Sequence, residues 1–449
     1  MKAYKTNQPS KSVIAALSAG RRLLPAVISL ALVAGANGEG FRNPPPGTFN
    51  LGRAGGRIAH VDDSSAVHQN PANLMDLTRP EVQFTPTIVY ISADFKSSIT
   101  GEKADTENPW KLLPNLFAST PLMDGKMAVG LGVTTPYGIG SEWDKDSAAF
   151  APATATTPPG VLRYTSTYYA ELQTININPT VAFRLADRIT VGAGLDAMWS
   201  QVTLKQFYPW AIFPGSTGFE PDGNMKGEGD GWGWGGNVGI TFQITDRQRL
   251  AVTYRSQMDV DYSGDFDISN ITPTAASFGA TSSSDFDTKI KFPNILAVGY
   301  GVQVTDKVRL EANVEWIQFS RFKTLNIDAG NNNVLLPPSS QSVAQDWKDT
   351  YTVGIGGDWR FADRWVLRSG FQYYDSPVPD STFSPTVPDA NQYVFTIGLG
   401  FKGKHNSFEF AYGLDFYDQR KIENDQQPAF NGKYDITVHL FSVAYRYEF

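Results

Sequence analysis

The chain has no cysteine and only four histidines among its 449 residues. The missing cysteine excludes disulfide bonds and thiolate metal sites. The histidines are scattered and form no metal-binding motif, so we expect neither a metal nor a cofactor. No run of 18 uncharged apolar residues occurs, which excludes a bundle of membrane-spanning helices.

Helical periodicity is nearly absent after residue 80, and an alternation of apolar and polar residues takes its place. At the carboxyl end, Phe441, Val443, Tyr445, Tyr447 and Phe449 alternate with small or charged residues. Such a strand has one apolar and one polar face. The apolar face would meet a core in a soluble sandwich, whereas it would meet lipid in a membrane barrel.

Fourteen segments carry this alternation, and an even number is typical of bacterial outer-membrane barrels. Short turns, as at Ala186–Asp187–Arg188, alternate with long loops, a regularity that a soluble sandwich has no reason to keep. The sequence therefore predicts an all-β protein, a 14-stranded antiparallel transmembrane β-barrel over residues 81–449. We expect its strands at roughly 82–99, 110–121, 126–138, 170–186, 188–204, 231–245, 248–263, 285–304, 307–325, 348–361, 364–375, 391–402, 407–420 and 434–449.

Residues 1–38 contain five basic residues and no acidic one, and an apolar run from Leu23 to Ala36 ends in small residues. This pattern predicts a secretory signal peptide, with cleavage after Ala36 or Gly38, and the alternative is an N-terminal membrane anchor. Removing the peptide moves the formal net charge from −7 to −12. An acidic chain is a poor partner for nucleic acid.

Residues 39–80 are rich in Gly, Pro, Asn and Asp and show little alternation. Their apolar residues, among them Phe49, Leu51 and Ile58, are more than a disordered tail needs. The segment must lie in the periplasm or inside the barrel, where it is long enough to plug the lumen. Asp62 and Asp63 favour a turn over a catalytic or metal-binding pair, because adjacent side chains of an extended chain point apart.

Several segments, in order along the chain, match one family. They are LGRAGG (residues 51–56), DDSSAVHQNPA (62–72), TTPYGIGSEW (134–143), WGWGGNVGI (232–240), LAVTYRS (250–256), FPNILAVGY (292–300), WKDTYTVGIG (347–356), the W..R.GF..YDSPVP pattern (365–379) and the terminal Phe449. With them the sequence resembles the FadL-type family of outer-membrane transporters of long-chain fatty acids, which also contains importers of aromatic hydrocarbons. The resemblance implies a barrel plugged by an N-terminal hatch over residues 39–80.

The resemblance also implies a route. A hydrophobic ligand is caught at the outer loops, passes to an apolar pocket and leaves sideways through a gap made by a kinked third strand. Asn70, Pro71 and Ala72 match the hatch motif and are expected to take part in gating. Pro71 lacks a backbone donor and Asn70 can bond to local backbone, which suits a defined irregular turn.

We expect the lateral opening at Pro136, Tyr137, Gly138 and Gly140 in the third strand. Proline removes a donor from the strand ladder and glycine tolerates unusual dihedral angles, so pairing can fail here. A simple strand end at Pro136 is the alternative. A sideways exit would spare an apolar molecule re-exposure to water, which costs about 0.8 kcal/mol per methylene.

A fatty acid carboxylate would need a nearby cation. Arg368 faces inward by alternation, and Arg163 and Lys205 border long loops, so these three are the predicted ligand-binding residues, with ordinary solvated charges as the alternative for the last two. Near Val343 and Gln392, where the family's basic residues are expected, the chain has none. A neutral ligand therefore stays open.

We predict a passive importer of long-chain fatty acids or related hydrophobic compounds in the outer membrane of a Gram-negative bacterium. The expected partners are the ligand, outer-membrane lipid and the outer-membrane assembly machinery. The alternatives are an importer of neutral aromatic or aliphatic hydrocarbons, a general porin and a barrel enzyme acting on lipids. No G-x-S-x-G motif is present, and we do not expect an enzyme.

Overall fold

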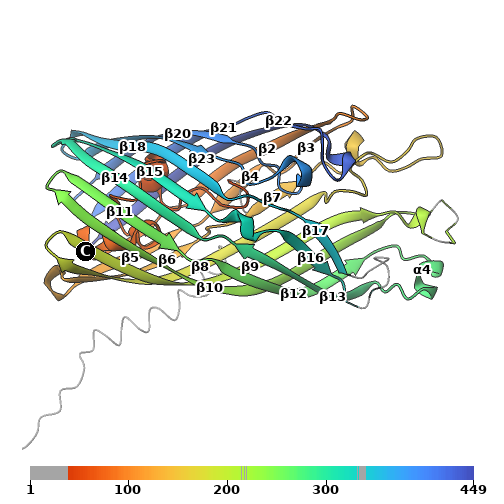
Figure 1. Ribbon diagram of the computed structural model, residues 1–449, viewed down its shortest axis with the longest axis horizontal. Helices are drawn as coiled ribbons and strands as arrows, with labels where there is room; N and C mark the ends of the chain where they lie inside the picture. The colour runs from red at the N-terminus through yellow and green to blue at the C-terminus, as the bar shows by residue number, and fades with distance from the viewer. Residues whose placement is uncertain (1–38, 214, 217, 219, 331, 333–339) are drawn as a thin grey trace, which may run out of the picture. The chain divides into compact units, whose positions relative to one another are not determined.

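A computed structural model describes residues 39–449 apart from 214, 217, 219, 331 and 333–339. The expected signal peptide, residues 1–38, lies outside the described residues. Taken by themselves, residues 39–449 form one closed barrel of long tilted strands (Figure 1). No helix in this part of the chain is long and apolar enough to cross a membrane.

The wall consists of fourteen antiparallel strands, as the sequence predicts. Several are interrupted, so that two or three segments follow one another within one strand. In order around the wall they are β1 (Glu81–Phe84) with β2 (Thr87–Ser97); β3 (Lys103–Asp105), β4 (Trp110–Leu113) and β5 (Leu116–Leu122); β6 (Met127–Thr134) with β7 (Ile139–Glu142); β8 (Tyr169–Ala186); β9 (Ile189–Tyr208); β10 (Gly223–Thr245); β11 (Gln248–Arg255) with β12 (Met258–Ile268); β13 (Ser283–Phe292) with β14 (Ile295–Thr305); β15 (Val308–Ile317) with β16 (Thr324–Asp328); β17 (Ser340–Ala344) with β18 (Thr350–Ala362); β19 (Trp365–Tyr374); β20 (Gln392–Lys402); β21 (Asn406–Tyr417) with β22 (Arg420–Ile422); and β23 (Gly432–Glu448). The ring closes where β23 pairs with both β1 and β2.

The helices among the described residues are all short. They are α2 (Thr48–Gly52), α3 (Ala66–Gln69) and α4 (Pro273–Ser277), with single 3₁₀ turns η1 (Pro71–Asp76), η2 (Met123–Gly125), η3 (Ala148–Phe150), η4 (Trp210–Ile212), η5 (Phe319–Arg321), η6 (Asp380–Thr382) and η7 (Pro428–Phe430). Two of the helices and one 3₁₀ turn, α2, α3 and η1, belong to residues 39–80, which we call the N-terminal segment.

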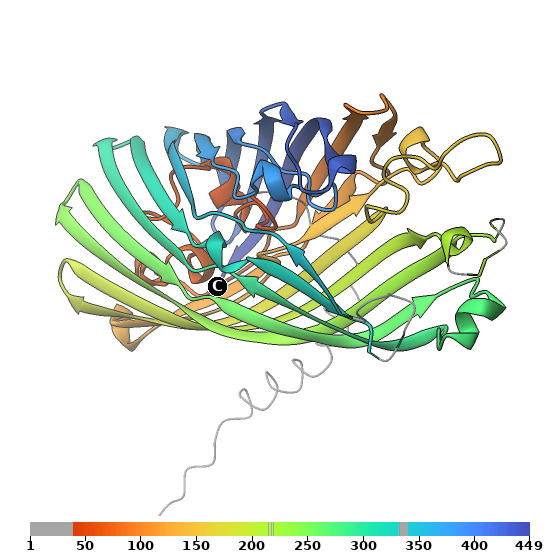
Figure 2. The same cartoon turned by 45° about the vertical axis from the view of Figure 1, so that its right-hand side comes forward.

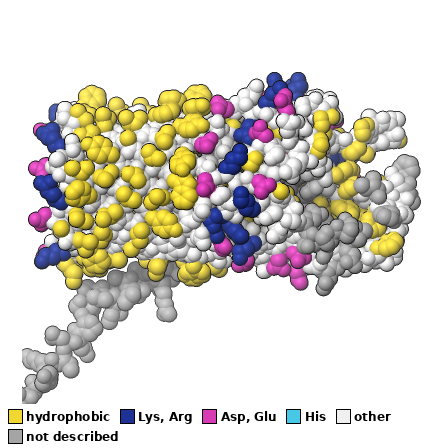
Figure 3. Space-filling view, in the orientation of Figure 1, with side chains coloured by type: hydrophobic (Ala, Val, Ile, Leu, Met, Phe, Trp, Pro, Cys, Tyr) yellow, Lys and Arg dark blue, Asp and Glu magenta, His cyan; other side chains and the backbone are white. Residues whose placement is uncertain are grey.

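The outer face carries an apolar band. Phe395, Ile397 and Leu399 of β20 are 39–51% exposed, and the residues between them face inward. Figure 3 shows the band over the half of the barrel nearer the short turns, with charged side chains at that end and again beyond the band. A belt of this kind matches the hydrocarbon layer of a membrane.

Several strands extend further than the sequence pattern predicts. β10 begins at Gly223 instead of residue 231, β12 reaches Ile268, and β16 pairs with β17, which lies between the strands predicted at 307–325 and 348–361. Outside the apolar band the outward side chains are charged, as at Lys226 and Asp261, so the alternation disappears while backbone pairing continues. Hydropathy marks the depth of the membrane and not the end of a strand.

The N-terminal segment lies inside the barrel, where Figure 2 shows it in red and orange within the wall. Its backbone touches inward glycines of the wall. A Cβ atom at Gly356 of β18 would lie 2.0 Å from the carbonyl oxygen of Arg53, and one at Gly192 of β9 would lie 2.5 Å from the backbone of Pro71. Only glycine permits these approaches, so the wall is shaped to fit the segment on both sides.

Replacing one of these glycines with a larger residue should displace the N-terminal segment and leave the pairing of the barrel strands intact. We expect Gly356→Leu to displace residues 53–56, raise the ion conductance of the barrel in planar bilayers and leave the folded barrel in place. Folding is checked by migration on denaturing gels, where the unheated protein should run faster than the boiled protein. Ile355→Leu, one residue away on the lipid face, is the matched control, and an unchanged conductance in Gly356→Leu would contradict the close fit.

Candidate functional site

The third strand of the wall is broken at residues 135–138, which we call the strand break. β6 pairs with β8 up to Thr134, and pairing with β8 resumes with β7 at Ile139. On the other side, β5 pairs with β6, but no ladder among the described residues joins β4 to β7, and contact returns only at an isolated bridge between Thr106 and Trp143. The wall therefore contains an unpaired stretch between β4 and β7.

All four residues predicted for the lateral opening lie at this place. Pro136, Tyr137 and Gly138 are in the strand break, and Gly140 is in β7 beside the unpaired stretch. Their position agrees with the physical reason for choosing them, since proline cannot donate to a ladder. Their part in passage stays a prediction.

The N-terminal segment covers the strand break from inside. The amide N–H of Asn43 donates to the carbonyl of Pro136 at 3.0 Å, and the N–H of Gly138 donates to the carbonyl of Phe41 at 2.8 Å. Arg42 and Tyr137 are bridge partners between these two bonds. Residues 41–43 thus act as a short extra strand, and a clear path through the break requires them to move.

Phe41 anchors this short strand in an aromatic cluster. Its side chain is 1% exposed and stacks on Trp347, with ring centroids 5.1 Å apart. The remaining members surround it edge-on: Tyr137, Phe292, Phe319 and Phe322. The cluster belongs to a larger apolar core that fills the lumen toward the long loops. An apolar ligand in this position would have to compete with Phe41.

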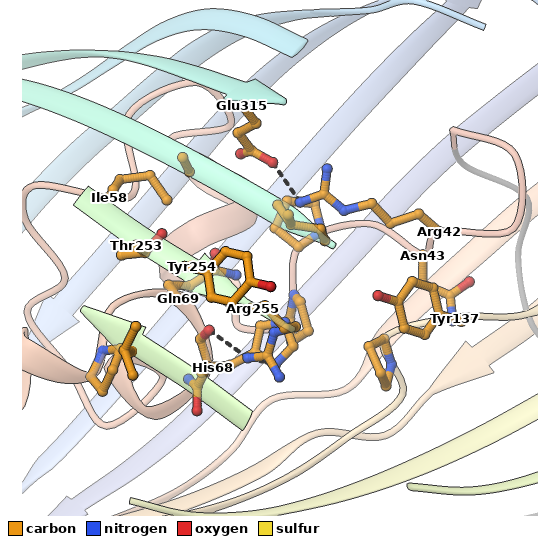
Figure 4. A pocket seen from close by; sticks show the side chains of 18 residues that line it. Arg42, Asn43, Ile58, His68, Gln69, Tyr137, Thr253, Tyr254, Arg255 and Glu315 are labelled. Carbon is orange, nitrogen blue, oxygen red and sulfur yellow. Dashed lines mark hydrogen bonds and ion pairs between the residues drawn. The ribbon is translucent and has the colours of Figure 1, made fainter. Parts of the chain in front are cut away.

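A small cavity with both charged and apolar lining residues lies beside the strand break (Figure 4). Arg42, Tyr137 and Arg255 line it, together with His68 and Glu315 among others. Its free volume is about 50 Å³. Arg42 donates to Glu315 at 2.6 Å, and Arg255, at the end of β11, donates to the carbonyl of His68 at 2.9 Å.

Charged side chains tie the N-terminal segment to one side of the wall. Glu311 of β15 accepts from the backbone N–H groups of Ile58 at 2.6 Å and Ala59 at 2.7 Å. Glu315, four residues further along the same face of β15, binds both Arg42 and Arg57. Buried charges are tolerated only when paired, so these bonds fix the position of the segment.

Glu39 begins the described chain and is buried against β18. Thr350 and Thr352 donate to its carboxylate. Burial raises the pKa of Glu39 to about 7, although the Arg42 guanidinium works in the opposite direction. Near neutral pH this carboxyl group therefore holds its proton for part of the time.

The predicted hatch residues tie the segment to the opposite side of the wall. The side-chain amide of Asn70 donates to the carbonyl of Ile58 at 2.8 Å and to Thr241 of β10 at 2.9 Å. Its oxygen accepts from the N–H of Ala72, and Pro71 begins η1. These contacts make the defined turn that the sequence predicts, while a role in gating stays a prediction.

The three predicted ligand-binding cations are not brought together. Arg368 faces inward and pairs with Glu409 at 3.1 Å, and Arg163 pairs with Asp222 at 2.6 Å. Lys205 lies 4.6 Å from the ring of Tyr169, next to the exposed Lys226 on the outer face. They share no bonded partner among the described residues.

Two arginines at the strand break, Arg42 and Arg255, were missed by sequence reasoning. Arg255 could have been found, because alternation along LAVTYRS places it on the inward face with Ala251 and Thr253. Arg42 lies in an irregular segment, where no periodicity indicates the direction of a side chain. Its place is fixed only by the tertiary bonds to the strand break and Glu315.

A closed barrel with an apolar belt, an internal segment and an unpaired stretch in its wall defines an outer-membrane transport protein. A family model described as outer membrane protein transport protein (OMPP1/FadL/TodX) matches residues 29–449, and the chain belongs to this family.

Known proteins of this kind are similar to the chain in sequence or in fold over most of its length. The long-chain fatty acid transport protein of Escherichia coli O6:H1 is 25% identical, with 91% of this chain and 94% of the relative covered. The 47 kDa outer membrane protein of Pasteurella multocida is 24% identical, with 93% and 97% covered. A Pseudomonas aeruginosa FadL homologue has a TM-score of 0.76 at 20% identity, covering 91% of this chain and 100% of that one. The toluene transporter TodX of Pseudomonas putida has a TM-score of 0.72 at 17% identity, covering 90% and 99%.

Neutralising the carboxylate shared by Arg42 and Arg57 should release the N-terminal segment. We expect Glu315→Gln to lower the free energy of unfolding by about 3–5 kcal/mol, because two buried guanidinium groups lose their anion. The measurement is the urea midpoint of the folded band in detergent. Asp246→Asn removes a pair with Arg188 that is open to solvent and should change little; equal effects of the two substitutions would rule out this anchoring.

Proposed function

We propose that the protein imports hydrophobic compounds passively across the outer membrane of a Gram-negative bacterium. The observation that carries the proposal is the unpaired stretch between β4 and β7, which lies beside an apolar lumen and is covered from inside by residues 41–43. Membership of an outer-membrane transport family supports it. Outer-membrane lipid and the assembly machinery are the further partners that such a barrel needs.

The proposed route runs from the long loops through the apolar core to the strand break. Side chains such as Val260, Phe286 and Phe292 line the lumen between these points. A ligand that moves from this interior into the membrane core avoids water, and re-exposure would cost about 0.8 kcal/mol per methylene. A water-filled channel would offer an apolar molecule no such advantage.

In this proposal the N-terminal segment is the hatch and residues 81–449 are the channel. Residues 41–43 move away from the strand break, while Asn70, Pro71 and Ala72 hold the rest of the segment against β8, β9 and β10. The segment occupies the lumen, which argues against a general porin. Transport of this kind needs no covalent chemistry.

The ligand class is the finer part of the proposal. Relatives carry the name long-chain fatty acid transport protein, and neighbours of similar fold include toluene transporters. We propose a long-chain fatty acid as the ligand, with a neutral hydrocarbon as the second candidate. Ligand binding by Arg163, Lys205 and Arg368 stays a prediction, to be tested by replacing each with glutamine.

A disulfide latch tests whether residues 41–43 must move. Arg42 and Tyr137 form a non-hydrogen-bonded antiparallel pair, whose Cα atoms are about 4.5 Å apart and suit a disulfide. The chain has no cysteine of its own. We expect the Arg42→Cys/Tyr137→Cys protein to lose uptake of a fatty acid methyl ester when oxidised and to regain it on reduction.

The two single variants, treated in the same way, control for the substitutions themselves. Uptake by the oxidised double variant at the rate of the reduced one would contradict passage through the strand break. Because the same protein is compared in two redox states, the result does not depend on other effects of losing Arg42 and Tyr137.

A further inference from the structure

The cavity of Figure 4 is lined by charged and polar side chains together with proline and aliphatic residues, whereas the cluster next to it is aromatic. A site needs roughly 10–15 Å³ of such volume to hold one water. The 50 Å³ available therefore accommodates a small polar group and excludes a long alkyl chain. The cavity suits the head of an amphipathic molecule whose tail lies elsewhere.

Two donor groups at this cavity make no hydrogen bond among the described residues. The hydroxyl of Tyr137 belongs to a side chain that is 1% exposed, and it makes no hydrogen bond. Nη1 of Arg42 also makes none, and lies 3.5 Å from a carboxylate oxygen of Glu39. Buried donors without partners are unfavourable, and both groups line the cavity.

The net charge of the side chains around the cavity is positive whenever Glu39 is protonated. Arg255 is balanced by Asp196 at 2.6 Å. Arg42 and Arg57 share Glu315, and the other nearby acid is Glu39. Because burial raises the pKa of Glu39 to about 7, its protonated fraction leaves one guanidinium without an anion.

We propose that this cavity binds the carboxylate of an amphipathic acid, with Arg42 and Tyr137 as the donors. The apolar tail then lies toward the aromatic cluster around Phe41, which borders Tyr137. The inference rests on the proposed import function and names the ligand class for the same route. Because Arg42 is also part of the strand that covers the break, the head group binds at the point where the wall opens.

A further cation borders the same unpaired stretch. Lys111 of β4 is 9% exposed and lies opposite Val89, which is buried on the lumen side. Its ammonium makes no hydrogen bond, and no ion pair within 4.0 Å, with any residue that the structure describes, and the carboxylates of Glu171 and Glu142 attract it from a longer distance. An acid that moves from the cavity toward the gap would meet this charge, whereas a neutral hydrocarbon would gain nothing from it.

The test compares a long-chain fatty acid with its methyl ester, which has almost the same shape and no charge. Binding to the purified barrel in detergent is measured at neutral pH. The acid should bind at least about tenfold more tightly than the ester, as a charge-assisted hydrogen bond provides. Arg42→Gln and Tyr137→Phe should each lower the affinity for the acid towards that for the ester and so remove much of this preference.

Two further variants separate recognition from structure. Lys111→Gln cannot release residues 41–43, and it should slow uptake of the acid relative to the ester. Arg249→Gln, whose guanidinium pairs with Asp76 away from the cavity, is the matched control and should keep the preference. A variant that weakens acid and ester equally would show a structural role for the residue and overturn its assignment as a donor.

The outcomes also separate this inference from the proposed function. If acid and ester bind and enter equally well, the head-group site is wrong and hydrophobic import stands. If neither is bound nor taken up, the proposed function fails as well. A preference for the acid that survives Arg42→Gln, Tyr137→Phe and Lys111→Gln would place carboxylate recognition elsewhere in the barrel.

Discussion

In a membrane wall every backbone N–H and C=O group needs a partner, because lipid supplies none. Antiparallel ladders meet this need along most of the described wall, and the strand break is a place where they do not. There the missing partners come from residues 41–43 on the inside and from the side chain of Thr174. The wall and the N-terminal segment are therefore one hydrogen-bonded structure, and ordinary backbone pairing covers the strand break.

The segment is held differently on its two sides. Toward β15 and β18 the bonds are ionic and buried, as with Glu311 and Glu315, whereas toward β10 they are neutral bonds from Asn70. Inward glycines let the backbones approach on both sides. Ionic anchors resist removal because an unpaired buried charge is unfavourable. They include Arg42, which pairs with Glu315 and Glu39, so these pairs add to the backbone bonds that hold residues 41–43 at the strand break.

The sequence predicts the barrel well because the alternation that marks each strand lies within a short stretch of the chain. Alternation records which face meets lipid, and that is enough for the strand number and for the inward direction of Arg368. It does not record partners, so the pairing of Arg368 with Glu409 was not foreseen. The place of the strand break was expected from the family resemblance, and Pro136 supplies a local reason for it, since proline cannot donate to a ladder whatever lies beside it.

The cavity beside the strand break could not be predicted from the alternation of apolar and polar residues. Arg42 lies in a segment without regular structure, and its neighbours Tyr137, Arg255 and Glu315 come from three distant parts of the chain. Only the closed barrel brings them together. The early start of β10 was missed for another reason, because charged side chains on its outer face hide a strand that continues beyond the membrane.

This continuation has a consequence for where the barrel does its work. A strand needs only about 9–11 residues to cross the hydrocarbon layer, and β10 has 23. The surplus lies on the side of the long loops, and there the inner face is still lined by apolar side chains such as Phe286 and Val260, which lie beside the glycines of β10. The apolar lining of the lumen thus extends beyond the hydrocarbon layer, to the level of the charged lipid head groups. A molecule that leaves water at the loops is already in an apolar solvent before it reaches the depth of the lipid tails.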